Sequence, residues 1–109
     1  MSESKKFQEL FTKSLPFFNA LGHPVRQKLM LMMTTGAQLS VKELTAGTKL
    51  SRPTVSHHLK ILKNAHLIVE HKKGRETYYH PQPGEHFHTV KELIDTIDKA
   101  IKHNEGTTK

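Results

Sequence analysis

The sequence predicts a mainly α-helical protein with a small β-hairpin at about residues 67–80. Apolar residues recur at steps of three and four in four stretches, at about residues 4–21, 25–33, 55–62 and 87–101, as on one face of a helix. Capping residues mark two helix starts, and the stretch after residue 64 carries strand-forming residues around a glycine turn. With 109 residues, the chain is expected to form one domain.

The first stretch predicts an aromatic helix at about residues 4–21. It holds four of the five phenylalanines, which is more apolar surface than one short helix needs for its own domain. One interpretation is a helix that pairs with a second copy, and the other is a plain core helix. Because Pro16 interrupts the stretch, we expect a kink or a new helix start near Ser14, which could cap the second piece.

A second helix is predicted to open at Gly22-His23-Pro24, since proline is tolerated in a first turn. Arg26 and Lys28 lie off its apolar face. They could touch phosphates or be solvated surface charges.

Residues 40–64 predict two short helices joined by a tight turn. Ser40 and Glu43 have the spacing of a capping box, in which hydroxyl and carboxylate satisfy free backbone N–H groups at a helix start. Ser51 is placed as a second N-cap, and Pro53 falls in the first turn of the helix that follows.

The second of these helices has one apolar face and one polar, basic face. Val55, Leu59 and Leu62 form the apolar face. A short helix that shows its N-terminus and a basic ridge is typical of the recognition helix of a helix-turn-helix, whose side chains reach base edges in the DNA major groove. A helical hairpin with a merely solvated face is the alternative. The candidate DNA contacts on this helix are Arg52, Pro53, Thr54, Ser56, His57 and Lys60.

A hairpin is predicted directly after the recognition helix. Residues 67–71 and 76–80 have strand character, and residues 72–75 form the turn around Gly74. A hairpin in this position is the wing of a winged helix-turn-helix, unless it is only a solvated turn. Its basic side chains suit phosphates or the minor groove, and they are Lys72, Lys73 and Arg75.

A last helix is predicted at about residues 86–104, after a linker at residues 81–84. Its apolar residues form the narrow seam of a helix that packs lengthwise on another helix: Phe87, Val90, Ile94, Ile97 and Ile101. A monomer would give this helix little to cover. We therefore expect a homodimer through the first and last helices, and the low hydrophobic content of 35% without tryptophan also favours a shared core.

The charge pattern favours a polyanionic partner, namely double-stranded DNA. The formal net charge is +7 and the pI about 9.8. Residues 49–75 hold seven basic residues against one acidic residue, whereas residues 76–109 hold four basic residues against six acidic ones. The positive charge is thus concentrated on the predicted helix-turn-helix and wing.

Composition also excludes several classes of function. The absence of cysteine excludes disulfides, thiolate metal sites and thiol-based sensing. No apolar run of about 18 residues and no signal peptide are found, so we expect a cytoplasmic protein without membrane insertion. No phosphate-binding loop, nucleophile elbow or carboxylate pair is found, so we do not expect an enzyme.

The histidines, nine in all, are the remaining candidates for a metal site. His86 and His88 lie at the start of the last helix and could bind zinc together with His103 or Glu105 of a second copy. Solvated or titrating histidines are the simpler interpretation, so no cofactor is predicted.

Together these elements resemble the ArsR family of bacterial winged-helix repressors. Residues 20–26 (ALGHPVR), residues 50–62 (LSRPTVSHHLKIL), Gly74-Arg75 and Tyr78-Tyr79 carry the resemblance. It implies a homodimer that binds an imperfect palindrome in its own promoter and leaves DNA when a metal or another signal arrives. The resemblance also implies groove contacts by Arg52, Pro53, Ser56 and His57, and a wing contact by Arg75.

The sequence departs from the family members that sense metals with their last helix. Of their ligand positions, only His103 and Glu92 have counterparts, so metal sensing of that kind is not expected. We predict a transcriptional repressor, with control by a protein partner as one means of release. A winged helix that binds protein instead of DNA is the alternative function.

Overall fold

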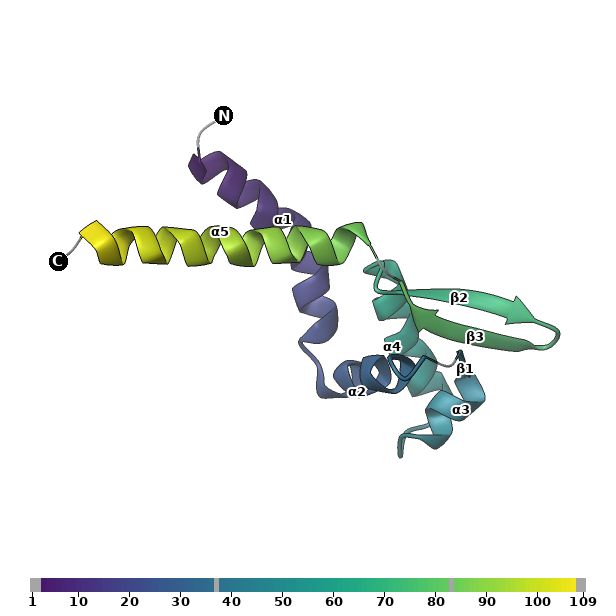
Figure 1. Cartoon of the computed structure of the whole chain (residues 1–109). Helices are drawn as coiled ribbons and strands as arrows, with labels where there is room; N and C mark the ends of the chain where they lie inside the picture. Colours follow the sequence, from purple (N-terminus) through teal and green to yellow (C-terminus); the bar gives the residue numbers. More distant parts are fainter. Residues whose placement is uncertain (1–2, 37, 83, 108–109) are drawn as a thin grey trace. The chain divides into compact units, whose positions relative to one another are not determined.

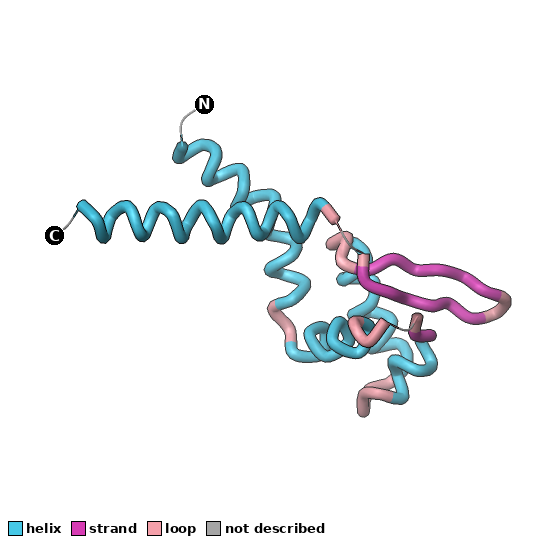
Figure 2. Tube along the Cα trace, in the orientation of Figure 1, coloured by secondary structure: helices cyan, strands magenta, loops and turns pink. Residues whose placement is uncertain are grey.

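The computed structural model describes residues 3–36, 38–82 and 84–107. As predicted, this part of the chain is mainly helical with one small antiparallel sheet (Figures 1 and 2). Residues 17–83 form one compact unit, and residues 1–16 with residues 84–109 form another. The elements in chain order are α1 (Glu3–Leu21), α2 (Pro24–Met33), β1 (Leu39–Ser40), α3 (Val41–Ala46), α4 (Arg52–Asn64), β2 (Ile68–Lys73), β3 (Glu76–Pro81) and α5 (Glu85–Thr107).

The unit of residues 17–83 contains a hydrophobic core that holds α2, α3, α4 and the sheet together. Each helix buries the apolar residues of one face, and full burial of a leucine side chain stabilises the fold by roughly 1.5–3 kcal/mol. The buried members of this core are Ala20, Leu29, Met33, Val41, Leu44, Val55, Leu59, Leu62, Ala65, Leu67, Ile68 and Tyr79.

Both helices of the helix-turn-helix begin at the predicted caps. Ser40 Oγ accepts a hydrogen bond from the Glu43 N–H at 3.1 Å, and Glu43 Oε1 accepts one from the Ser40 N–H at 3.1 Å. α3 is short and has Gly47 as its C-cap. Ser51 caps α4, with Pro53 in the first turn. The start of each helix is thereby fixed by local hydrogen bonds.

The sheet has a third strand that the sequence did not predict. β1 pairs antiparallel with β3, with Leu39 opposite Tyr79, and the strand order is β1-β3-β2. A strand of two residues is too short to show an alternating pattern, so only its pairing with β3 defines it.

The turn of the β2–β3 hairpin is tighter than predicted. Lys73 pairs with Glu76, which leaves Gly74 and Arg75 as the turn. Gly74 has a φ of +65°, a conformation that glycine adopts without steric cost. The prediction that Lys72 and Lys73 lie in the turn is therefore wrong, because both belong to β2.

The prediction of a new helix start near Ser14, within α1, is wrong. The helix continues through Pro16, and Ser14 lies inside it. Ser14 is fully buried, and its Oγ has no hydrogen-bond partner among the described residues. Proline removes one backbone hydrogen bond and crowds the carbonyl four residues earlier, a cost that tertiary burial of neighbours such as Leu10 can offset.

The apolar surface of α5 is wider than the predicted seam. Val90 is buried as a member of the seam should be, but Leu93, which lies outside the seam, is buried more completely. Ile94 and Ile101 are about half exposed, at 55% and 52%. Some apolar residues of α5 are thus covered by the chain itself, and others face solvent.

Candidate nucleic-acid interface

The recognition helix α4 has the two faces that the sequence predicts. Val55, Leu59 and Leu62 are fully buried at 0% exposure, so the helix is anchored along this face. The opposite face and the N-terminal turn are open to solvent. All the candidate contacts on α4 are exposed: Arg52, Pro53, Thr54, Ser56, His57 and Lys60.

Ser51 organises the exposed N-terminal turn of α4. Its Oγ accepts a hydrogen bond from the Thr54 N–H at 3.4 Å and lies 2.9 Å from Thr54 Oγ1. The Thr54 hydroxyl is thus engaged within the cap. Arg52 and Pro53 lie at the start of the helix, where the helix dipole and free N–H groups favour an anion.

The two adjacent histidines of α4 have different environments. His57 is exposed, whereas His58 is 8% exposed and packs its ring against His23, with ring centroids 4.7 Å apart. Burial lowers the pKa of His58, and the nearby His23, Arg26 and His57 lower it further. The sequence contained a signal for this burial, because His58 lies three residues after Val55 and four before Leu62 on the apolar face.

Arg26 is half-buried and makes contacts within the protein that neither interpretation from the sequence included. Its Nε donates to the Ala20 carbonyl at 2.6 Å, and its Nη2 donates to the Asn19 carbonyl at 3.1 Å. Its Nη1 lies 3.2 Å from Nδ1 of His58. Two of these partners are carbonyls of the last turn of α1, which have no acceptor role inside the helix. The guanidinium therefore caps α1.

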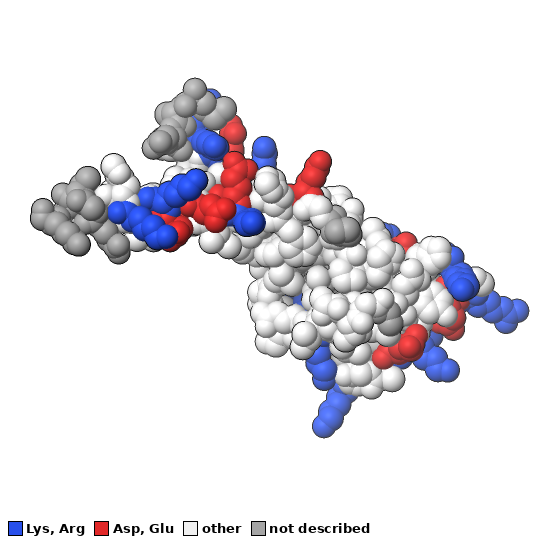
Figure 3. Space-filling model, in the orientation of Figure 1, with Lys and Arg blue, Asp and Glu red and all other residues white. Residues whose placement is uncertain are grey.

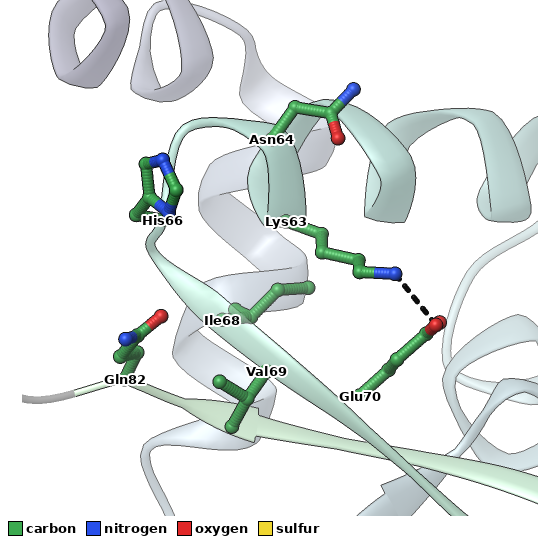
Figure 4. Close-up of a pocket in the computed structure, with 7 residues that line it drawn as sticks. All are labelled: Lys63, Asn64, His66, Ile68, Val69, Glu70 and Gln82. Atoms are coloured by element: carbon green, nitrogen blue, oxygen red, sulfur yellow. Dashed lines mark hydrogen bonds and ion pairs between the residues drawn. The ribbon is translucent and has the colours of Figure 1, made fainter.

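Lys63, at the C-terminal end of α4, is paired with the wing (Figure 4). Its Nζ lies 2.6 Å from Glu70 Oε1, and the Tyr79 hydroxyl donates to Glu70 Oε2 at 3.2 Å. The hydrogen bond and charge of Lys63 lower the pKa of the Glu70 carboxyl, while burial and then Glu70 raise the pKa of Tyr79. Glu70 is the acidic residue in the otherwise basic segment 49–75, and it joins α4 to the hairpin.

The same end of α4 borders an open groove, which Figure 4 shows in close-up. It is lined by Lys63, Asn64, His66, Ile68, Val69, Glu70 and Gln82. Because its Lys63 and Glu70 already neutralise each other, this groove offers no uncompensated charge from that pair to a ligand.

The hairpin presents the three predicted basic side chains, Lys72, Lys73 and Arg75, all of them exposed. In Figure 3, Lys and Arg side chains project from the end of the hairpin. Side chains alternate along a strand, so Lys72 shares the face of Glu70 and lies on the side of α4, whereas Lys73 points to the other face. Arg75 occupies the turn itself.

The candidate metal ligands are not gathered into a site. Within residues 3–36, 38–82 and 84–107, no three or more His, Cys, Asp or Glu side chains are grouped so that they could hold a metal ion. His86, His88 and His103 all lie on α5.

Among the residues that the structure describes, no helix is long and apolar enough to span a membrane.

Comparisons with known proteins agree with this geometry. The model of bacterial regulatory proteins of the arsR family matches residues 23–69, which include α2, α3 and α4. The transcriptional repressor SdpR of Bacillus subtilis is 36% identical over 62 residues, which are 57% of this chain and 68% of SdpR. An HTH-type transcriptional regulator of Methanocaldococcus jannaschii is 30% identical over 84% of this chain and 98% of that protein. The chain belongs to the ArsR family.

Solved structures support the same assignment. The transcriptional regulator HlyU of Vibrio vulnificus superposes with a TM-score of 0.68 at 26% identity, over 86% of this chain and 97% of HlyU. This ArsR-family chain is thus a DNA-binding transcriptional regulator and not an enzyme. The predicted family, winged-helix fold and regulatory function are confirmed, and the dimer and the individual DNA contacts remain predictions.

Proposed function

We propose that the chain is a homodimeric repressor that binds a palindromic operator with α4 in the major groove. The main support for this proposal is that α4 buries one face completely, while its start and its opposite face are exposed to solvent. A helix anchored in this way enters the groove without losing any of its packing, and the neighbouring α3 then crosses the DNA backbone.

Base recognition is assigned to Arg52, Ser56 and His57. Arginine donates two parallel hydrogen bonds to O6 and N7 of a guanine, whereas a serine hydroxyl adapts to several bases. Pro53 and the methyl group of Thr54 supply apolar contacts of the kind that a thymine methyl accepts. Lys60 lies on the same exposed face and suits a phosphate.

The wing is assigned contacts that add affinity without reading sequence. Lys72 and Lys73 in β2 and Arg75 in the turn would pair with phosphates or lie in the minor groove. Each phosphate contact releases counterions, so the affinity depends on salt. Lys63 is left out of this set because Glu70 holds it.

The dimer is assigned to α1 and α5. Large apolar side chains of these helices are 38–55% exposed in the single chain: Phe11, Leu15, Phe87, Ile94 and Ile101. A second copy offers the same faces and would cover them in a symmetric contact. Two copies would hold their α4 helices about one turn of DNA apart, ~34 Å. If another protein covers these faces instead, the chain is an interaction module or a repressor released by a protein partner.

The test combines light scattering with titration of the protein against a duplex from its own promoter and a scrambled duplex. The titration is run at two salt concentrations, with and without zinc. The proposal expects the mass of two copies and tighter promoter binding that weakens with salt. A monomer mass would overturn the dimer, and equal weak binding to both duplexes would overturn the specific repressor. Release by zinc would instead point to a site of His86, His88 and His103 shared between two copies.

A further inference from the structure

A buried histidine lies in the middle of the recognition helix, on the side away from the proposed DNA contacts. His58 Nδ1 is 3.2 Å from Arg26 Nη1. Arginine only donates hydrogen bonds, so Nδ1 must be the acceptor and cannot carry a proton. His58 is therefore neutral in this arrangement, with its proton on the other ring nitrogen.

Arg26 joins three helices through one guanidinium. It lies in α2, it binds the Asn19 and Ala20 carbonyls at the end of α1, and it reaches His58 on α4. Its positive charge at the C-terminal end of α1 is also favourable to the helix dipole. Besides the packing of the apolar face of α4, the polar link from α4 to α2 and to this end of α1 is thus a bond that only the neutral form of His58 can accept.

We propose that Arg26 is a positioning residue for DNA binding, which fixes the recognition helix through neutral His58 and releases it when His58 is protonated. A proton on Nδ1 turns the acceptor into a donor, so the bond to Arg26 is lost. It also places a second positive charge beside the guanidinium, and the two groups then repel. The clamp acts on DNA only if the proposed function holds, because it works by orienting α4 in the groove.

The groups around His58 all oppose its positive charge. They are Arg26 and His23 from α2 and its N-cap, and His57 from α4 itself, whose ring centroid lies 5.8 Å from that of His58. His23 adds to the effect, because its Nδ1 accepts the hydrogen bond of the Val25 N–H that caps α2. The His23 ring therefore stays fixed beside His58 and belongs to the same corner of the unit.

The direction of the pH effect separates this clamp from ordinary electrostatics. Acidification makes the protein as a whole more positive, and added positive charge strengthens binding to DNA of any sequence. The clamp instead predicts that specific binding weakens. The quantity to measure is therefore the ratio of the affinities for the promoter duplex and for a scrambled duplex.

We would measure this ratio from about pH 7.5 down to about pH 4.5 at constant ionic strength, because burial and the nearby His23 and Arg26 hold the pKa of His58 below its ordinary value of 6.5. For the wild-type protein the ratio should fall about tenfold, because protonation of His58 removes one charge-assisted hydrogen bond. His58→Asn offers an amide oxygen as acceptor and does not titrate, so its ratio should stay flat. The matched control is His66→Asn, at an exposed position with a φ of +61° that asparagine tolerates, and it should keep the wild-type profile.

Arg26→Lys keeps the positive charge but lacks the guanidinium group that reaches three acceptors. The promoter-to-scrambled affinity ratio of this variant should therefore already be low at neutral pH and change little on acidification. A constant ratio in the wild-type protein, or the same fall in His58→Asn, would overturn the clamp. If the wild-type protein does not prefer the promoter even at neutral pH, the proposed function fails and the clamp fails with it.

A readout on the unmodified protein covers the case in which the variants do not fold. In an NMR titration, backbone amides of α4 and of residues 19 and 20 should shift together, with a midpoint below 6.5, the ordinary pKa of histidine. Amides of α4 that stay unchanged through this range would overturn the clamp.

Discussion

Replacing Arg52 by alanine tests whether the start of α4 reads bases. Arg52 is exposed, and the cap of α4 is formed by Ser51 and Thr54, so the helix should persist without the Arg52 side chain. A guanidinium paired with guanine contributes about 1–3 kcal/mol of discrimination, which is roughly 5–150-fold in affinity. We expect Arg52→Ala to weaken binding to the promoter duplex by a factor in this range and to change binding to a scrambled duplex much less.

The assay is fluorescence anisotropy with labelled promoter and scrambled duplexes at two salt concentrations. Lys72→Ala is the matched control, because it also removes one exposed cation from the proposed surface. It should weaken binding to both duplexes alike and reduce the slope of log affinity against log salt by about 1. Circular dichroism checks the fold of each variant. Equal losses on the two duplexes for Arg52→Ala would refute base reading and make Arg52 a phosphate contact.

Three further substitutions probe the core, the wing and the dimer. Leu59→Ala should lower the free energy of unfolding by about 2–5 kcal/mol in urea titrations, and a loss under ~1 kcal/mol would contradict the anchoring of α4. Glu70 has a lowered pKa, so it stabilises the fold above its ordinary value of 4.5, and this contribution disappears as pH falls through the lower folded pKa. Glu70→Gln should therefore flatten the acid limb of a melting-temperature profile, and an unchanged limb would show that the Lys63 pair contributes nothing. Ile94→Asp should reduce the mass in light scattering to one copy, whereas Lys91→Asp, at an exposed polar position of α5, should not; equal behaviour of the two would argue against this interface.

Local signals predicted much of the fold correctly. Ser40 with Glu43 and Ser51 with Pro53 fix where α3 and α4 start, because capping bonds join residues only a few positions apart. Gly74 similarly indicates the hairpin turn. The extent of the turn was predicted too long, because Lys72 and Lys73 continue β2. The other differences from the prediction depend on distant parts of the chain. β1 exists only through its pairing with β3, and α1 continues through Pro16 where the local rule predicts an interruption.

The ArsR-type order of helices, the apolar face of α4 and the basic residues beside it can all be predicted from the sequence, since helical and strand periods are properties of neighbouring residues. Which polar residues remain available for DNA depends on contacts that form only when the chain folds. Arg26 and Lys63 look like surface cations in the sequence, but one caps α1 and binds His58, 32 positions away, and the other pairs with Glu70, 7 positions away. The roles of Arg26 and Lys63 depend on acceptors that folding brings within hydrogen-bond distance. Local sequence patterns do not predict which acceptors these are.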